Sequence, residues 1–286
     1  MSSKIKKSTQ TLPIPKIIIY IAKTLEIIAP ALAIKFAAKL FVTPIKHKAP
    51  KREWNMIDNS SNQMMVVPTI KKSIHLYFYG TGNQKVLLVH GWSGRGTQLV
   101  KIADALKEKG YAIVSFDAPA HGKSTGKISI MTEFIATILE IDKQFGPFDI
   151  AIGHSLGGMS ILNAVKQGFQ TKKIVTISAG DIIQDILDDF CAKLKMKANF
   201  STRLRNYFES KFNEKMDDYS AYKSAKVCEI PTLLIHDEQD DDVSVKAAFH
   251  IQKHLKNGEV YITQHLGHRK ILGDKSVIHK ILEFIN

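Results

Sequence analysis

The spacing of apolar and polar residues changes near residue 64 of this 286-residue chain. Between Pro13 and Val42, isoleucine, leucine and phenylalanine recur at helical spacing and lysines interrupt them. Pro30 lies inside this stretch, and because proline lacks a backbone donor we predict two helices that separate there. After residue 64, short apolar runs alternate with amphipathic segments. This alternation predicts strands and helices in turn.

The alternating region predicts a doubly wound α/β fold, with a mostly parallel sheet and helices on both faces. A break at residues 181–225 has a helical pattern and many charges, and we expect a small helical cap there. The predicted strands are Met64–Pro68 and Ile74–Tyr79 (antiparallel), then Val86–Val89, Ala112–Phe116, Phe148–Ile152, Lys173–Ser178, Pro231–His236 and Glu259–Thr263. The predicted helices are Thr97–Lys109, Ile128–Phe145, Met159–Gly168, Val245–Leu255 and Lys275–Ile285.

The positive charge of the chain is concentrated at its beginning. The net charge is +13, and residues 1–72 hold 13 basic residues against three acidic ones. The remaining residues are close to neutral, which argues against a nucleic-acid-binding body. We therefore divide the chain into a basic amphipathic helical extension, residues 1–50, and an α/β domain, residues 51–286. The segment Met1–Thr11 is polar and Lys-rich, and we expect it to be mobile.

The helices expected in residues 13–42 have two interpretations. Their apolar face either packs on the α/β domain or a second subunit, or lies on an anionic membrane surface as a peripheral contact. No window of about 18 residues is free of charge, so a membrane span is not expected. The apolar run Ile17–Ala22 is too short for a secretion signal. With only Cys191 and Cys228, the composition favours reduced thiols and a cytoplasmic location, with the inner membrane surface as the peripheral alternative.

The segment Gly153-His154-Ser155-Leu156-Gly157-Gly158 carries the strongest chemical signal. It follows an apolar strand and precedes a helix, which is the setting of a nucleophile elbow. The glycines leave room for a tight turn, and the helix start directs its N–H groups toward developing negative charge. We predict that Ser155 is a nucleophile.

The remaining parts of an acyl-transfer site follow other predicted strands. His90-Gly91-Trp92 follows one strand, and the N–H groups of Trp92 and Leu156 are candidate oxyanion donors; His90 itself we expect to be structural. In the acidic run after Ile235 we select Asp240 as the acid, with Asp241 next. In the last loop His268 is the candidate base, and we expect His265 to be structural. The order Ser155, Asp240, His268 is that of one particular fold.

On these residues the chain resembles an α/β-hydrolase fold protein over about residues 64–286. The loop Asp117–Ser124 is similar to the D-x-x-G-H-G-x-S loop of many members. The chain departs from the pattern at Asp237 and at Ala120, where glycine is more frequent. The resemblance implies a hydrolase but not a substrate, because the superfamily hosts many chemistries. A serine at position 155 disfavours dehalogenase and epoxide hydrolase activity, for which members generally use an aspartate.

The sequence therefore predicts a serine hydrolase that cleaves a small-molecule carboxylic ester or thioester with no cofactor and no metal. The alternatives are a membrane-associated lipase that acts on acyl lipids and a non-catalytic binding protein on the same scaffold. Gly122-Lys123-Ser124 lacks the first glycine of a P-loop, so nucleotide binding is not expected. His250 and His254 lack a metalloprotease motif. The oligomeric state stays open. Six aromatic residues of the cap are candidates either for the lining of an acyl pocket or for the cap's own core: Phe190, Phe200, Tyr207, Phe208, Phe212 and Tyr219.

Overall fold

The structure is a computed structural model that describes residues 14–286. The Lys-rich segment Met1–Thr11, expected to be mobile, and Pro13 lie outside the described residues. Within the described part, no helix is long and apolar enough to cross a membrane.

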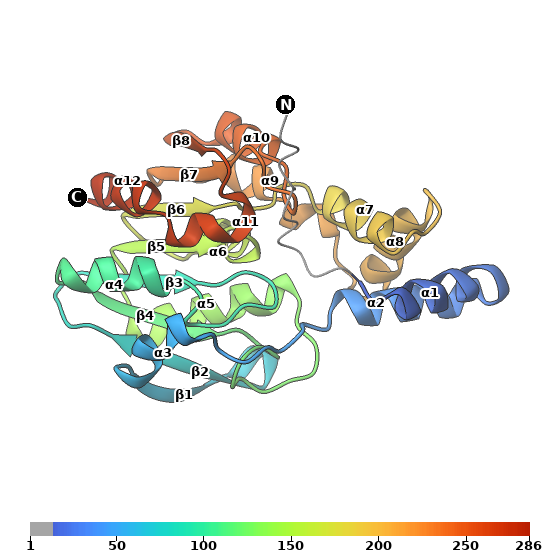
Figure 1. Ribbon diagram of the computed structural model, residues 1–286, viewed down its shortest axis with the longest axis horizontal. Coiled ribbons are helices and arrows are strands. Elements are labelled where there is room, and N and C mark those ends of the chain that lie inside the picture. The colour runs from blue at the N-terminus through green and yellow to red at the C-terminus, as the bar shows by residue number, and fades with distance from the viewer. Residues whose placement is uncertain (1–13) are drawn as a thin grey trace, which may run out of the picture.

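One eight-stranded sheet forms the centre of the molecule, in the order β1-β2-β4-β3-β5-β6-β7-β8 (Figure 1). β1 pairs with β2 and β2 with β4 in antiparallel fashion, and every later pair is parallel. The expectation of a mostly parallel sheet is thus confirmed. The strands are β1 (Ser61–Val67), β2 (Lys72–Tyr79), β3 (Lys85–Val89), β4 (Ala112–Asp117), β5 (Ile150–His154), β6 (Lys173–Ile177), β7 (Thr232–Asp237) and β8 (Gly258–Thr263).

Helices cover both faces of the sheet, because its central strands are buried on both sides. Apolar side chains of α5, α6 and α10 join the core on one face, and those of α4 and α12 join it on the other. These helices are α4 (Val100–Glu108), α5 (Met131–Phe145), α6 (Leu156–Lys166), α10 (Lys246–His254) and α12 (Lys275–Ile285). The five predicted helices are therefore present, although α6 begins three residues earlier than expected.

Two short helices were not predicted, α3 (Lys51–Asp58) and α11 (Gly267–Lys270). Both are too short to form on their own and depend on tertiary contacts. In α3, the buried carboxylate of Glu53 accepts a hydrogen bond from Thr97 Oγ1 at 2.7 Å. Because this contact joins residues that are 44 positions apart in the sequence, no local sequence pattern predicts α3.

Four helices project beyond the carboxyl edge of the sheet (Figure 1). α7 (Ile183–Lys193) and α8 (Phe200–Phe212) belong to the segment between β6 and β7, which also holds α9 (Ala221–Ala225). α1 (Lys16–Ile28) and α2 (Pro30–Phe41) separate at Ala29, next to Pro30, as predicted.

The two helix pairs pack on each other. The ring of Phe41 lies 5.1 Å from that of Phe190 and 5.7 Å from that of Phe208. Glu26 Oε1 accepts a hydrogen bond from Lys197 N at 3.0 Å. The packing interpretation of the N-terminal segment therefore holds for one face of the helix pair.

Candidate active site

Ser155 stands in a sharp turn between β5 and α6, with φ 52° and ψ −120°. A non-glycine residue rarely adopts this conformation, so its neighbours must hold it there. Ser155 N donates to Ile177 O on β6 at 2.9 Å. A Cβ atom on Gly153 would lie 2.6 Å from Gly157 C, and one on Gly157 would lie 2.6 Å from His90 O. Only glycine fits at both positions, and the turn sets Ser155 at the head of α6.

The candidate base and acid are in contact. His268 Nδ1 lies 2.8 Å from Asp240 Oδ2, and the Asp240 side chain is fully buried. Burial raises the pKa of Asp240, but hydrogen bonds from His268 and from backbone N–H groups outweigh it and lower the pKa to about 2. Asp240 is therefore ionised at neutral pH. Asp241, the second choice from the sequence, is exposed.

His154 links the nucleophile elbow to the loop that carries His268, which we call the histidine loop. Its Nε2 donates to His268 O at 2.9 Å, and the two imidazole rings lie 4.6 Å apart. Since His154 directly precedes Ser155, this contact fixes the backbone of His268 to the nucleophile elbow. Burial, followed by the nearby His268, holds the pKa of His154 well below its usual value, so the ring stays neutral.

The candidate oxyanion donors come from two touching segments. A Cβ atom on Gly91 would lie 3.0 Å from Ser155 Cβ, so the loop that carries Trp92 packs against the elbow. Leu156 is the first residue of α6, where helix N–H groups have no partner within the helix. Within residues 14–286, no protein acceptor takes the N–H of Trp92 or of Leu156.

Comparisons to known proteins agree with the fold of this chain. Residues 86–221 match the model of the alpha/beta hydrolase family. An esterase from Pyrococcus furiosus superposes with a TM-score of 0.66 at 18% identity, covering 85% of this chain and 98% of the esterase. The chain has the α/β-hydrolase fold.

Other α/β-hydrolase relatives are similarly distant. An esterase from Exiguobacterium antarcticum is 15% identical with a TM-score of 0.61, covering 76% of this chain and 96% of that one. A membrane phospholipase A described as a bacterial virulence factor is 16% identical with a TM-score of 0.62, covering 94% and 96%. A serine hydrolase-like protein of Dictyostelium discoideum is 27% identical over 149 residues, half of this chain. The chain spans about two fifths (41%) of that curated relative's length.

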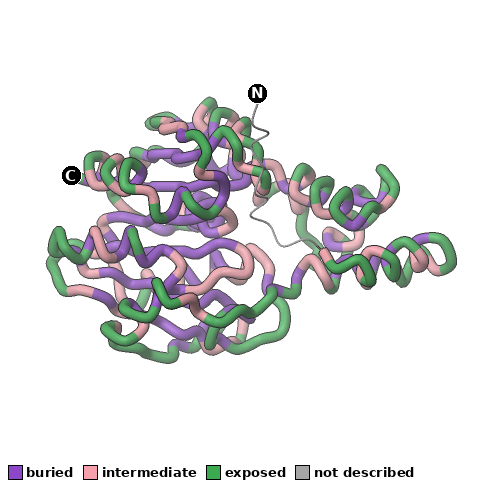
Figure 2. The backbone as a smooth tube through the Cα atoms, in the orientation of Figure 1, coloured by how far each residue is buried: buried purple, intermediate pink, exposed green. Residues whose placement is uncertain are grey.

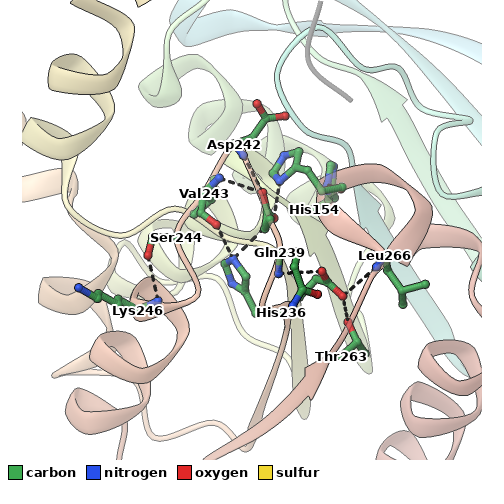
Figure 3. A network of polar contacts seen from close by, with 12 residues as sticks. His154, His236, Gln239, Asp242, Val243, Ser244, Lys246, Thr263 and Leu266 are labelled. Atoms are coloured by element: carbon green, nitrogen blue, oxygen red, sulfur yellow. Dashed lines mark hydrogen bonds and ion pairs between the residues drawn. The ribbon is translucent and has the colours of Figure 1, made fainter. Parts of the chain in front are cut away.

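Asp237, a departure from the α/β-hydrolase sequence pattern, links the loop that carries Asp240 to the loop that carries His268. Its partners Gln239, Thr263 and Leu266 are labelled in Figure 3. Its Oδ2 accepts from Thr263 Oγ1 at 2.8 Å and from Leu266 N at 3.0 Å. Its Oδ1 accepts from Gln239 N at 3.0 Å. These hydrogen bonds outweigh burial and lower the pKa of Asp237, so it is ionised and acts only as an acceptor. Sequence reasoning missed this role because Thr263 and Leu266 are far from Asp237 in the chain.

The acid loop is braced from within as well (Figure 3). Asp240 Oδ1 accepts from the N–H groups of Asp242 and Val243, each at 2.9 Å. His236 Nε2 donates to Val243 O at 2.9 Å and lies 3.6 Å from Asp240 Oδ2. Both carboxylate oxygens of Asp240 are therefore held, one by the loop and one by His268.

The Asp117–Ser124 loop supports the segment that carries Trp92, a candidate oxyanion donor. His121 Nε2 accepts from Ser93 N at 3.1 Å, and its ring lies 5.3 Å from that of Trp92. Burial, followed by the nearby His90, lowers the pKa of His121 to about 3, so it stays a neutral acceptor. Asp117 accepts from Gly96 N at 2.7 Å and anchors the far end of the same segment.

The structure accounts for His90 and for Ala120, the second departure from the α/β-hydrolase sequence pattern. Ala120, where glycine is more frequent, keeps the left-handed conformation at φ 63°. His90 Nε2 accepts from Ala118 N at 2.9 Å while Nδ1 donates to Gly91 O at 2.7 Å. This geometry fits the structural role expected for His90. Its pKa is lowered to about 4 by burial, so it is neutral.

Two sequence features for which we expected no metal or nucleotide binding supply none of the candidate catalytic residues. They are the pair His250 and His254 and the P-loop-like segment Gly122–Ser124. His250 Nδ1 pairs with Asp181 Oδ2, which ties α10 to the cap, and the His254 ring lies 4.7 Å from that of His250. Among the described residues, no group of three or more His, Cys, Asp or Glu side chains is arranged to hold a metal. In the P-loop-like segment, Lys123 N donates to Asp117 Oδ2 at 2.8 Å. An aspartate thus occupies the backbone donor that a phosphate would need.

An apolar cavity of about 80 Å³ opens between the helix pairs and the sheet domain. This cavity adjoins α6, the helix that begins directly after Ser155. The side-chain amide of Asn163 on α6 donates to Tyr219 O at 2.9 Å and contacts Met131 Sδ at 3.7 Å. The cap aromatics Phe208, Phe212 and Tyr219 line this cavity, whereas Phe190, Phe200 and Tyr207 are not among its lining residues. Phe41 and Val42 from the end of α2 also contribute, which the sequence did not suggest. The remaining lining residues are Ile130, Met131, Thr132, Ile183, Glu214 and Met216.

Proposed function

We propose that this protein is a serine hydrolase that cleaves carboxylic esters or thioesters through an acyl-enzyme. The observation that carries the proposal is the 2.8 Å contact between His268 Nδ1 and the buried carboxylate of Asp240. A binding protein on the same scaffold has no need of this pair beside a serine in a strained turn. The contact therefore favours an enzyme over the non-catalytic alternative.

The proposed mechanism follows from the protonation states. Because Asp240 is ionised, it accepts from His268 Nδ1–H, which leaves Nε2 of the ring as the base. Nε2 takes the proton of Ser155 Oγ while the oxygen attacks the carbonyl carbon. The N–H groups of Trp92 and Leu156 stabilise the oxyanion, and Asp240 stabilises the imidazolium.

The second half of the cycle reverses the roles. The tetrahedral intermediate collapses, the bond to the leaving group breaks, and His268 Nε2–H protonates the departing alcohol or thiol. His268 Nε2 then takes a proton from water as its oxygen attacks the acyl carbon. The bond between that carbon and Ser155 Oγ breaks, His268 returns the proton to Oγ, and the carboxylic acid leaves. No cofactor enters this sequence.

We place the acyl group of the substrate in the apolar cavity. The cavity wall contains Met131 and Tyr219, and both contact Asn163 on the helix that starts beside Ser155. Asn163 is eight residues after Ser155, roughly 12 Å along the helix axis at 1.5 Å per residue. An acyl chain that extends from Ser155 along α6 would reach this wall, so the arrangement favours substrates with an apolar acyl group.

A covalent probe tests the proposal. A fluorophosphonate should label the wild-type protein at Ser155, identified by peptide mass spectrometry, and should not label Ser155→Ala. A folded wild-type protein that stays unlabelled would refute a serine nucleophile. A chain-length series of p-nitrophenyl esters, run beside acyl-CoA thioesters, then distinguishes ester from thioester hydrolysis.

We also propose a cytoplasmic location. Cys191 and Cys228 are free and buried thiols, which suits a reducing compartment. Cell fractionation tests this: recovery of the protein from an oxidising compartment would contradict it.

A further inference from the structure

The outer side of α1 carries an apolar surface that residues 14–286 leave exposed. The inner side of the helix pair packs on the cap, where Ala22 and Glu26 are buried in α1 and Ala33 and Ala37 in α2. On the opposite side, exposed residues run along the helix pair (Figure 2). We call this the outer face, formed by Ile17, Tyr20, Ile21, Ile27 and Ile28.

The outer face is continuous on the helix surface. At about 100° per residue, its five side chains lie within a sector of about 120°. Ile17, Tyr20 and Ile28 are 63%, 69% and 72% exposed. Large side chains so exposed along one side of a single helix differ from the scattered exposed apolar residues of most surfaces.

The charges around this face have one sign. Residues 14–50 contain six lysines and one acidic residue. That acid, Glu26, is buried and accepts a hydrogen bond from Lys197 N. Lys16 and Lys23 are exposed and lie at the border of the outer face. Every charge that this segment exposes is therefore positive, and the complementary partner is anionic.

We propose that the outer face of α1 docks on an anionic phospholipid bilayer. Its isoleucines enter the boundary between headgroups and acyl chains, Tyr20 takes the amphipathic position that suits its ring and hydroxyl, and the lysines meet the lipid phosphates. The helix lies in the plane of the surface and does not span it. This binding goes beyond the proposed hydrolysis and does not depend on it.

Docking in this way has a consequence for access to the cavity. Phe41, at the end of α2, forms part of the cavity wall and packs on the cap rings of Phe190 and Phe208. The same helix pair therefore presents the outer face and builds one wall of the apolar cavity. Bound to a bilayer, the protein holds this cavity close to acyl lipids.

Vesicle co-flotation of the full-length protein tests the proposal. We expect binding to vesicles of phosphatidylcholine with 30% phosphatidylglycerol and little binding to phosphatidylcholine alone. Ile17→Ser/Ile28→Ser should lower partitioning about tenfold, since each loses apolar burial. Lys16→Gln/Lys23→Gln should lower it by tenfold or more at low salt.

Matched controls use the same substitutions away from the face. Val227→Ser/Phe249→Ser changes two residues that are 59% and 50% exposed, and Lys101→Gln/Lys275→Gln removes two exposed lysines. Both controls should float like the wild type. Hydrolysis of a short soluble ester should be the same for all four variants, which separates a failure of docking from a failure of the proposed catalysis.

Three results would overturn the proposal. The first is equal flotation, or none, for the wild type and Ile17→Ser/Ile28→Ser. The second is a loss confined to the lysine variant, which would mean unspecific charge attraction. The third is a wild-type dimer in light scattering that Ile17→Ser/Ile28→Ser dissociates without any vesicle binding, which would assign the face to a second copy of the chain.

Discussion

The elbow around Ser155 and the acid loop Asp237–Val243 lie at the same edge of the sheet but are held by different forces. At the elbow, close approach of backbone atoms around Gly153 and Gly157 leaves no room for a side chain. In the acid loop, Asp237 and Asp240 accept hydrogen bonds from backbone and side-chain donors. Steric exclusion by close backbone atoms fixes the shape of the elbow. The acid loop is held by hydrogen bonds that depend on ionised carboxylates.

This difference means that the two regions should fail under different perturbations. Added volume should break the elbow, because backbone atoms cannot move aside without shifting β3 and β5. Neutralised charge should break the acid loop, because its buried donors then lose their acceptors. Each of the following substitutions changes one kind of contact and leaves the other intact.

Asp240→Asn should produce the largest effect. The amide can no longer accept from His268 Nδ1–H as a carboxylate does, so the ring loses its tautomer and its charge stabilisation. We expect kcat to fall by roughly 10⁴-fold, measured by burst-corrected ester hydrolysis. Asp241→Asn, at the exposed neighbour, should leave kcat unchanged. Comparable losses in both variants would contradict the assignment of the acid to Asp240.

Gly157→Ala should destabilise the protein through volume alone. The new Cβ would lie 2.6 Å from His90 O and closer still to Val89 O, so β3 and α6 must separate. We expect a loss of about 3 kcal/mol in the free energy of unfolding by urea. Gly273→Ala is the matched control, since its Cβ would meet only Lys101 Cγ at 3.8 Å. If both variants unfold alike, the steric account of the elbow is wrong.

Asp237→Ala should loosen the acid loop and the histidine loop together. It leaves the donors of Thr263, Leu266 and Gln239 without their acceptor, which we expect to cost about 2–3 kcal/mol of stability. Because His268 follows the released loop, kcat should also fall, while the elbow still positions Ser155 for a small fluorophosphonate. Retention of full kcat in Asp237→Ala would show that the clamp does not position His268.

Acid should weaken the acid loop but not the elbow, and this is the smallest expected effect. The folded pKa of Asp240 is about 2, below its ordinary value of 3.8, so its contribution is present above pH 3.8 and is lost as the pH falls toward 2. The stability difference between wild type and Asp240→Asn should therefore shrink by about 2 kcal/mol between pH 5 and pH 2. The difference between wild type and Gly157→Ala should stay constant over this range. A constant difference for Asp240→Asn would argue that its carboxylate gains nothing from its partners.

Patterns of apolar residues predicted the strands and main helices well, because each strand is buried by its own side chains. They also placed Ser155, Asp240 and His268 near one another, since each follows the end of a parallel strand. They left Asp240 and Asp241 unresolved, because only the folded chain buries one and exposes the other. Roles that depend on distant partners were missed, namely the clamp at Asp237 and the support of Ser93 by His121.

The chain that leaves α2 runs to the loop that carries Trp92 and is held along the way by hydrogen bonds. Val42 O accepts from Ser129 N at 2.8 Å, Ile45 N donates to Ser93 Oγ at 3.0 Å, and Lys46 Nζ donates to Gly122 O at 3.0 Å. A protein shortened to begin after residue 45 would therefore lose a tether on the residue next to Trp92, together with the helices. Loss of activity in such a truncated protein would not distinguish a missing membrane contact from a displacement of Trp92, the candidate oxyanion donor. Point substitutions on the outer face of α1 avoid this ambiguity.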